Sequence, residues 1–203
     1  MKLRAAELHL AQNDPRFAAI IAKAGRCALK RSKDFEPFQA LTRSICHQQL
    51  HGKAAETILQ RFKDRVGKGD WPTPLQVKRA RMTTMRACGL SEAKSLALKD
   101  LAKKVLDGTV PSAKVLHTLP EEEIITRLTQ VRGIGRWTVE MVLMSHLGRL
   151  DVLPVDDFGV RKGFSLLAKK KELVTAKELR IHGERWAPYR TVAAWYLWRV
   201  ADG

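Results

Sequence analysis

Two adjacent carboxylates, Asp156 and Asp157, follow Pro154 at a point where an apolar helical pattern begins. A carboxylate at a helix start can accept hydrogen bonds from the first-turn amides, which is a structural role. In a dry pocket it can instead stabilise a developing positive charge or deprotonate a water molecule. We expect Asp156 to cap the helix that begins at about Asp157.

The segment 128–141 places two glycines, Gly133 and Gly135, between an amphipathic helix and an apolar one. Glycines permit positive φ and leave the backbone uncovered. A helix that starts at the second glycine directs its amides and the positive end of its dipole outwards, and Arg132 and Arg136 add positive charge beside them. The pattern predicts a phosphate-binding turn. The alternative is a tight helix connection without a ligand, because GxG alone is a weak signal.

His47 and His51 are four residues apart on an expected helix, a spacing similar to the zinc motif HExxH. Gln48 stands where that motif has the glutamate that serves as general base, and no third ligand is evident. We therefore do not expect a metal here. A solvated polar cluster at a helix end is the alternative that the residues leave open.

Apolar residues recur with a period of 3.6 nearly everywhere, and no segment alternates with a period of two. The sequence therefore predicts an all-α fold of about ten short helices, without internal repeats or a low-complexity linker. The expected helices cover about residues 15–23, 37–49, 51–66, 74–89, 91–108, 112–117, 120–130, 137–146, 157–169, 175–186 and 189–201.

The chain of 203 residues is strongly basic, with 37 Lys and Arg against 21 Asp and Glu and a net charge of +16. Such a balance indicates a polyanionic partner, either nucleic acid or an anionic membrane. The charge is spread along the chain without a basic tail, and its densest stretch, residues 78–114, has nine basic residues against three acidic ones. A folded basic surface is favoured over a disordered arm, and over the single basic amphipathic helix of a membrane-surface protein.

The three cysteines, Cys27, Cys46 and Cys88, are widely spaced and odd in number, so neither a disulfide framework nor a cysteine cluster is expected. Charge appears too early at the N-terminus for a signal peptide, and no apolar run approaches the ~20 residues of a membrane span. The sequence predicts a soluble protein of a reducing compartment.

Several segments, in this order, resemble the helix-hairpin-helix DNA glycosylases of the 3-methyladenine DNA glycosylase II type, over about residues 5–201. Residues 131–138 resemble the hairpin and residues 153–158 the proline-then-aspartate element. Residues 38–55 resemble the minor-groove wedge region of the alkylbase branch, which residues 89–94 and 184–190 also match. The resemblance implies a two-lobed all-α fold without the extra N-terminal β-rich domain of larger relatives. Lobe A would cover about 35–148, and lobe B about 1–34 plus 149–203.

The resemblance makes Asp157 the catalytic carboxylate, which would stabilise an oxocarbenium-like sugar. It nominates four residues for the wall of the base pocket: Trp137, Phe158, Met141 and Trp198. Met141 stands where larger relatives have tyrosine. Trp137 stands where bifunctional relatives have the lysine that forms a Schiff base, so the resemblance implies a hydrolase without lyase activity.

For DNA contacts, the resemblance implies that Gln49 fills the gap left by a flipped nucleotide. His51, where relatives more often have serine, would lie in the minor groove near the lesion. Further expected DNA contacts are Lys53, Lys94, Arg132, Gly133, Gly135 and Arg136. No cofactor is required. A structural Na⁺ or K⁺ could be held by the backbone carbonyls of Thr129, Val131 and Ile134. No iron–sulfur cluster is expected, because the C-terminal cysteines of the endonuclease-type relatives are missing.

The sequence thus predicts a base-excision repair glycosylase that flips alkylated purines of the 3-methyladenine and 7-methylguanine class out of duplex DNA. It would remove them by hydrolysis and leave an abasic site. The alternative is a catalytically weak helix-hairpin-helix protein that binds damaged DNA, and only Asp157 and the pocket aromatics argue against it. We expect a monomer with duplex DNA as its partner and no membrane. It would act in the cytoplasm or nucleoid of a bacterium, or in the nucleus of a eukaryote.

Overall fold

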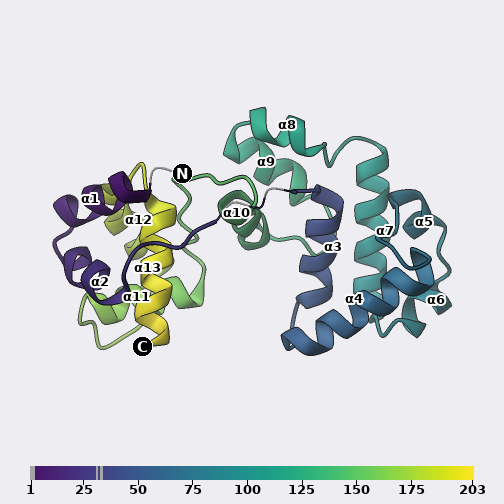
Figure 1. Cartoon of the computed structure of the whole chain (residues 1–203), viewed down its shortest axis with the longest axis horizontal. Helices are drawn as coiled ribbons and strands as arrows, with labels where there is room; N and C mark the ends of the chain where they lie inside the picture. Colours follow the sequence, from purple (N-terminus) through teal and green to yellow (C-terminus); the bar gives the residue numbers. More distant parts are fainter. Residues whose placement is uncertain (1–2, 31, 33) are drawn as a thin grey trace. The chain divides into compact units, whose positions relative to one another are not determined.

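The computed structural model describes residues 3–30, 32 and 34–203 (Figure 1). Its regular elements are thirteen α-helices and one 3-10 helix, with no strand among the described residues. The all-α prediction is confirmed. The helices outnumber the eleven expected ranges partly because residues 74–89 form two helices, with extended backbone at Ala80 and Arg81 between them. No helix among the described residues is long and apolar enough to cross a membrane.

The chain divides into two compact units. Unit 1 contains residues 1–33 and 140–203, and unit 2 contains residues 34–139. The second boundary lies inside helix α10 (Arg136–Ser145), whereas the resemblance implies a lobe boundary at about 148. The C-terminal half of α10 belongs to unit 1, where the Ser145 carbonyl accepts a hydrogen bond from the Ser32 amide at 3.1 Å.

Unit 2 is organised around α7, which contacts α3, α5 and α6, while α4 packs on α3 and α6. The fully buried Leu41, Leu59, Phe62, Leu98 and Leu101 form its core. Its helices are α3 (Pro37–His47), α4 (Gly52–Val66), α5 (Pro74–Arg79), α6 (Met82–Ala87), α7 (Glu92–Leu106), α8 (Ala113–Thr118), α9 (Glu121–Leu128) and the first turn of α10.

Unit 1 is built on the packing of α11 against α13, with α1 and α2 covering α13. Phe17, Phe164, Trp186 and Tyr196 are completely buried, and edge-to-face ring contacts join Phe17 to Trp186 and Phe164 to Trp186. Its helices are α1 (Leu3–Asn13), α2 (Arg16–Ala24), α11 (Phe158–Leu167), α12 (Ala176–Gly183), the 3-10 helix η1 (Glu184–Trp186) and α13 (Arg190–Asp202).

A buried carboxylate, Asp14, ties the start of α2 to this aromatic core. Its oxygens accept hydrogen bonds from Arg16 Nε at 2.7 Å and Nη2 at 2.6 Å, and from the indole of Trp186 at 3.2 Å. Burial alone would raise the pKa of Asp14, but the hydrogen bonds from Arg16 and Trp186 outweigh it, so the pKa is lowered from 3.8. The ionised form is therefore part of the native fold.

We predict that Asp14→Ala lowers the free energy of unfolding by about 2 kcal/mol at pH 7, because it leaves buried donors without an acceptor. Since the native pKa is depressed, this contribution is complete above pH 3.8 and disappears as the pH falls through the lower native value. Urea unfolding followed by circular dichroism measures both effects. Asp202→Ala, at an exposed C-terminal carboxylate, is the control and should unfold like the wild type. Equal stability of both variants would show that the Asp14 network contributes nothing.

Candidate nucleic-acid interface and active site

The hairpin of unit 2 joins α9 to α10 through residues 129–135. Within it, the amide of Val131 donates to the Leu128 carbonyl at 3.1 Å, and that of Ile134 donates to the Val131 carbonyl at 3.0 Å. Val131 and Ile134 are buried, so the turn rests on its two apolar side chains. The following helix begins at Arg136, one residue after Gly135, and its first turn directs the positive end of the dipole towards the turn.

Glycine is required by the backbone conformation at Gly133 but not at Gly135. Gly133 has φ +78, a conformation that favours glycine, whereas Gly135 does not. A Cβ added at Gly135 would meet nothing within 4 Å, so the protein itself does not require glycine there. The space in front of Gly135 suits close approach by a ligand backbone. Arg132 is exposed, while Arg136 pairs with the exposed Glu122, with Nη1 3.1 Å from Oε2.

Residues 48–51, which we call the wedge loop, connect two helices and are not part of one continuous helix. Helix α3 ends at His47 and α4 begins at Gly52, with His51 as its N-cap residue. The two histidines therefore do not share a helix face, and His47 Nε2 lies 3.1 Å from Glu56. Among the described residues no cluster of three metal-ligating side chains is found. Gln49, at the tip of the loop, has φ +56 and is exposed, as are His51 and Lys53.

The wedge loop and the hairpin are joined directly. Gln48 Nε2 donates to the Gly133 carbonyl at 2.8 Å, and the Arg132 amide donates to Asp100 Oδ2 on α7, also at 2.8 Å. These roles of Gln48 and Asp100 could not be predicted from the sequence, since their partners lie 85 and 32 residues away. These contacts hold the positions of the loop and the turn relative to each other.

Lys94 has a different partner from the one expected. Its Nζ donates to the carbonyls of Cys46 at 2.8 Å and Gln48 at 2.9 Å, at the C-terminal end of α3. Burial lowers the pKa of this ammonium group. Lys94 thus stabilises the wedge loop, because carbonyls left without partners at a helix end attract a cation. The ammonium group has a third N–H, so a DNA-phosphate contact stays a prediction.

A monovalent cation at the hairpin stays a prediction. Backbone carbonyls are suitable donors for a hard cation. The carbonyl of Val131 already accepts the Ile134 amide, yet a carbonyl oxygen has a second lone pair. Thr129 and Ile134 would supply the other two oxygens.

In unit 1, Asp157 is the N-cap residue of α11. Its Oδ1 accepts a hydrogen bond from the Val160 amide at 2.8 Å. Asp156 is exposed in the preceding turn and makes no capping bond, so the prediction that Asp156 caps this helix is wrong. The turn closed by the Asp157 amide and the Pro154 carbonyl at 3.0 Å starts the helix one residue later than expected.

Trp198 on α13 fixes the same carboxylate oxygen. Its indole Nε1 donates to Asp157 Oδ1 at 2.9 Å. A Cβ on Gly159 would lie 2.8 Å from Trp198 Cδ1 and 3.2 Å from Asp157 Oδ1, so only glycine admits the indole at this distance. The predicted pocket residue Trp198 is thus half-buried and holds Asp157. Gly159 is a site residue that the sequence analysis did not identify.

The other predicted pocket residues differ in exposure and belong to different units. Phe158 follows Asp157 directly and is 66% exposed, while Met141 is half-buried on α10. Both belong to unit 1, as Asp157 and Trp198 do. Trp137 belongs to unit 2, where it lies in the first turn of α10, next to the hairpin, and is 48% exposed. Large aromatic side chains at this exposure are available to a ligand.

The loop that leads to Asp157 is anchored to the start of α13. The guanidinium of Arg190 makes two hydrogen bonds of 2.8 Å to the carboxylate of Asp151. The Thr191 hydroxyl donates to the Arg149 carbonyl at 2.8 Å and accepts from the Val152 amide at 3.0 Å. The carboxylate and the indole that holds it therefore rest on one connected framework.

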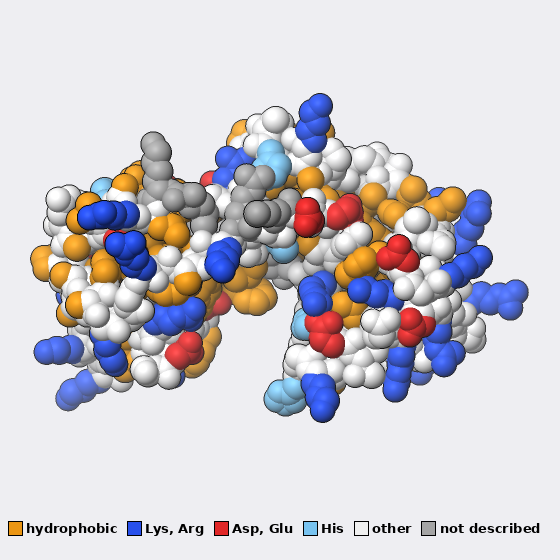
Figure 2. Space-filling model, in the orientation of Figure 1, with side chains coloured by type: hydrophobic (Ala, Val, Ile, Leu, Met, Phe, Trp, Pro, Cys, Tyr) orange, Lys and Arg blue, Asp and Glu red, His pale blue; other side chains and the backbone are white. Residues whose placement is uncertain are grey.

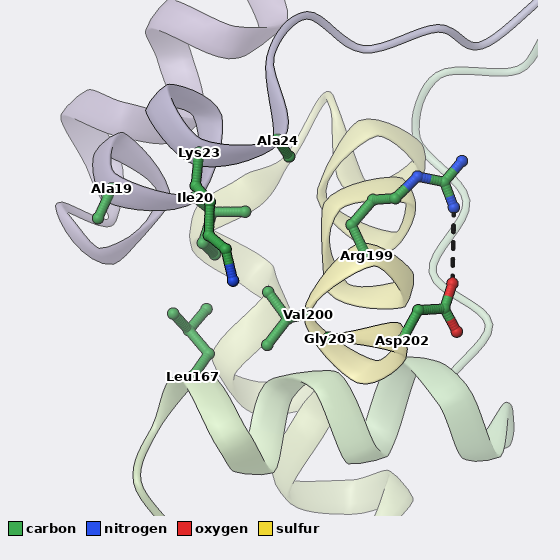
Figure 3. A pocket seen from close by; sticks show the side chains of 9 residues that line it. All are labelled: Ala19, Ile20, Lys23, Ala24, Leu167, Arg199, Val200, Asp202 and Gly203. Carbon is green, nitrogen blue, oxygen red and sulfur yellow. Dashed lines mark ion pairs between the residues drawn. The ribbon is translucent and has the colours of Figure 1, made fainter.

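A cavity of about 500 Å³ in unit 1 lies away from Asp157 (Figure 3). Residues of α2 and of the C-terminal ends of α11 and α13 line it, among them Lys23, Leu167 and Val200. Asp157 caps the other end of α11, whose ten residues span about 15 Å. This cavity is therefore not the expected base pocket.

Comparison with known proteins gives a consistent result. Residues 42–188 match the model of the HhH-GPD superfamily, described as base excision DNA repair proteins. The chain is 40% identical to DNA-3-methyladenine glycosylase 1 of Schizosaccharomyces pombe over 98% of this chain and 88% of that protein. It is 33% identical to the alkylbase DNA glycosidase-like protein mag2 of the same yeast, over 96% and 92%.

Solved structures agree with this assignment. The S. pombe 3-methyladenine DNA glycosylase Mag1, in complex with abasic DNA, superposes with a TM-score of 0.85 at 41% identity and covers 96% of this chain and 95% of its own. A DNA-3-methyladenine glycosidase from Bacillus halodurans gives a TM-score of 0.85 at 38% identity, over 95% and 87%. This chain belongs to the HhH-GPD superfamily of base excision DNA repair proteins.

Proposed function

We propose that this protein is a DNA glycosylase that hydrolyses the N-glycosidic bond of alkylated purines, of the 3-methyladenine and 7-methylguanine class, in duplex DNA. The observation that carries the proposal is the Asp157 carboxylate, held at the start of α11 by the Val160 amide and the Trp198 indole. The relatives named as 3-methyladenine glycosylases support the substrate class. The protein would act in the nucleoid of a bacterium or the nucleus of a eukaryote, where genomic DNA is found.

The main catalytic requirement of this reaction is one negative charge near the sugar. Cleavage of the bond leaves an oxocarbenium-like sugar, and a carboxylate near C1′ stabilises its positive charge. The same carboxylate can orient or deprotonate the attacking water. An alkylated purine that already carries a positive charge departs without a general acid, so the lesion itself supplies much of the selectivity. Because the bond is inaccessible in stacked DNA, the nucleotide must first be flipped out.

The aromatic side chains suit a cationic base. The electron-rich faces of Trp137 and Phe158 are exposed and would attract a positively charged ring. We assign Met141, which belongs to unit 1, to an apolar wall for the base. Trp198 has a second role, since its indole N–H is occupied by Asp157 and holds the carboxylate in place.

DNA binding would rest on unit 2. The turn at Gly133–Gly135 offers open space and a helix N-terminus to a phosphate, with Arg132 beside it. Arg136 would exchange Glu122 for a phosphate at little cost, since exposed ion pairs contribute little. Gln49 at the loop tip would fill the gap of the flipped nucleotide, with His51 and Lys53 following it along the groove.

We predict that Asp157→Asn reduces excision of 7-methylguanine at least about 100-fold, because the neutral amide no longer stabilises the sugar cation. Asparagine caps helices as well as aspartate does, so the fold should persist. Single-turnover excision and affinity for an abasic-site analogue measure the two effects. Binding should be retained. Normal excision by the variant would refute the catalytic assignment and leave a binding protein as the alternative.

We predict that Trp198→Phe lowers the single-turnover rate about 10-fold, since one hydrogen bond to a charged group is worth about 1.5–3 kcal/mol. Affinity for the abasic analogue should change little, because the indole acts through Asp157. Trp195→Phe, on the same helix and without a hydrogen bond to Asp157, is the matched control. A rate equal to that of the control would remove Trp198 from the mechanism.

We predict that strand scission requires alkali or an abasic endonuclease after base removal. Trp137 has no amine that could form a Schiff base with the sugar. Incubation of the enzyme with damaged duplex and borohydride should therefore yield no covalent protein–DNA adduct, as judged by denaturing gel electrophoresis. A trapped adduct would identify another amine as nucleophile and contradict the monofunctional assignment.

A further inference from the structure

The positive charge of unit 2 is concentrated at one end. Residues 34–139 contain 18 Lys and Arg against 11 Asp and Glu, a net charge of +7, and residues 61–86 alone contain 8 against 2, a net charge of +6. This stretch comprises the second half of α4, then α5 and α6. Figure 2 shows Lys and Arg side chains gathered at the right-hand edge of the view, where Figure 1 labels α5 and α6.

We call seven exposed members of this group the α4–α6 basic surface. It consists of Arg61, Arg65, Lys68, Lys78, Arg79, Arg81 and Arg86. Its members do not form ion pairs in the structure, which describes every residue from 34 to 139. Of the four other arginines in unit 2, by contrast, three are paired: Arg43 Nη1 with Glu56 at 2.6 Å, Arg127 Nη2 with Glu123 at 2.8 Å, and Arg136 with Glu122.

The surface is continuous across the contact between α4 and α6. Arg61 and Arg65 are four residues apart and so lie on the same face of α4. The Nη1 atom of Arg61 lies 3.9 Å from the Cβ position of Gly89, just after α6. Burial raises the pKa of the Cys88 thiol, and the nearby charges of Arg65 and Arg61 oppose this. Both guanidinium groups therefore lie near the C-terminal end of α6, the helix that carries Arg86.

Helix dipoles explain only part of this arrangement. Arg65 and Arg86 lie in the last turns of α4 and α6, where a cation is favourable. Arg81 is the N-cap residue of α6, where a cation is unfavourable, and its side chain makes no capping bond. Arg61 lies before the last turn of α4 and Lys68 after it. The accumulation of unpaired charge costs stability, and a polyanion would offset that cost.

Helix α4 connects the wedge loop to the α4–α6 basic surface. Helix α4 begins at Gly52, directly after the loop, and at 1.5 Å per residue Arg61 and Arg65 lie about 14 and 20 Å further along its axis. Phosphates of one strand follow each other every ~3.4 Å along duplex DNA. With α4 aligned along the duplex, these distances correspond to phosphates about four to six base pairs from the loop.

We propose that the α4–α6 basic surface binds backbone phosphates of the undamaged duplex on one side of the lesion. The binding footprint would then extend in one direction beyond the hairpin and the wedge loop. The proposal rests on the proposed function for the position of the lesion. It assigns the surface to affinity and to searching along DNA, because phosphate contacts carry no sequence information.

The test uses two 20-base-pair duplexes with an abasic-site analogue near one end or near the other, so that the long flank lies on opposite sides of the lesion. The wild-type protein should bind one duplex about 10-fold more tightly. The triple variant Arg65→Gln, Arg81→Gln, Arg86→Gln should lose this preference. On the preferred duplex, loss of three phosphate contacts makes the salt slope shallower by about 2.7. The variant's affinity should accordingly fall about 40-fold less than that of the wild type between 50 and 200 mM salt.

A matched control removes the same charge from unit 1. Lys169→Gln, Lys170→Gln, Lys171→Gln changes three exposed lysines and should retain the wild-type preference. Loss of the preference in both triple variants would show a diffuse charge effect and overturn the proposal. Equal behaviour of the first variant and the wild type would also overturn it, and would direct attention to an acidic protein partner.

Excision separates this proposal from the proposed function. At saturating enzyme, the Arg65, Arg81, Arg86 variant should remove 7-methylguanine at the wild-type rate, since these residues do not take part in the reaction. If the wild-type protein excises normally but shows no flank preference, the surface proposal fails and the function stands. If it shows the preference and excises no alkylated purine, the function fails and the surface proposal stands.

Discussion

The arrangement of the candidate active site in unit 1 depends on one carboxylate that is held in place from two helices. Asp157 Oδ1 accepts the first-turn amide of Val160 and the indole N–H of Trp198, so α11 and α13 share a single oxygen atom. Much around it serves this arrangement: Gly159 admits the indole, and Arg190 and Thr191 anchor the loop that delivers the carboxylate. A charge that has exchanged water for fixed dipoles can stabilise a cation without reorganisation at the moment of reaction.

In unit 2, some polar side chains bind within the protein while others of similar chemistry are exposed. Lys94 and Gln48 carry polar groups that could contact DNA, yet both are used within the protein to hold the wedge loop against the hairpin. The exposed Gln49 and Arg132 are left to face a ligand. The unpaired arginines of α4 and α6 supply charge at a distance from the loop. Precision near the lesion and long-range attraction are thus carried by separate residues, which allows affinity to change without disturbing the site.

Features of the site could be predicted from the sequence where the interacting residues are close together in the chain. The hairpin and the carboxylate at the start of a helix could be predicted because each depends on neighbours a few residues away. The assignment of the cap failed by one residue, from Asp156 to Asp157, because the preceding turn decides where the first helical amide lies. The helical spacing of His47 and His51 was misleading, since a loop interrupts the helix between them.

By itself, the sequence determined the helical fold, the basic character of the protein and the segments that mark its family. These properties come from local periodicity, from composition and from short motifs. The tertiary structure alone decided that Trp198 holds Asp157 from 41 residues away, that Gln48 reaches Gly133 across 85 residues, and that Lys94 binds the carbonyl of Gln48. Hydrogen bonds over such separations depend on how helices pack, and packing is not encoded in any short stretch of residues.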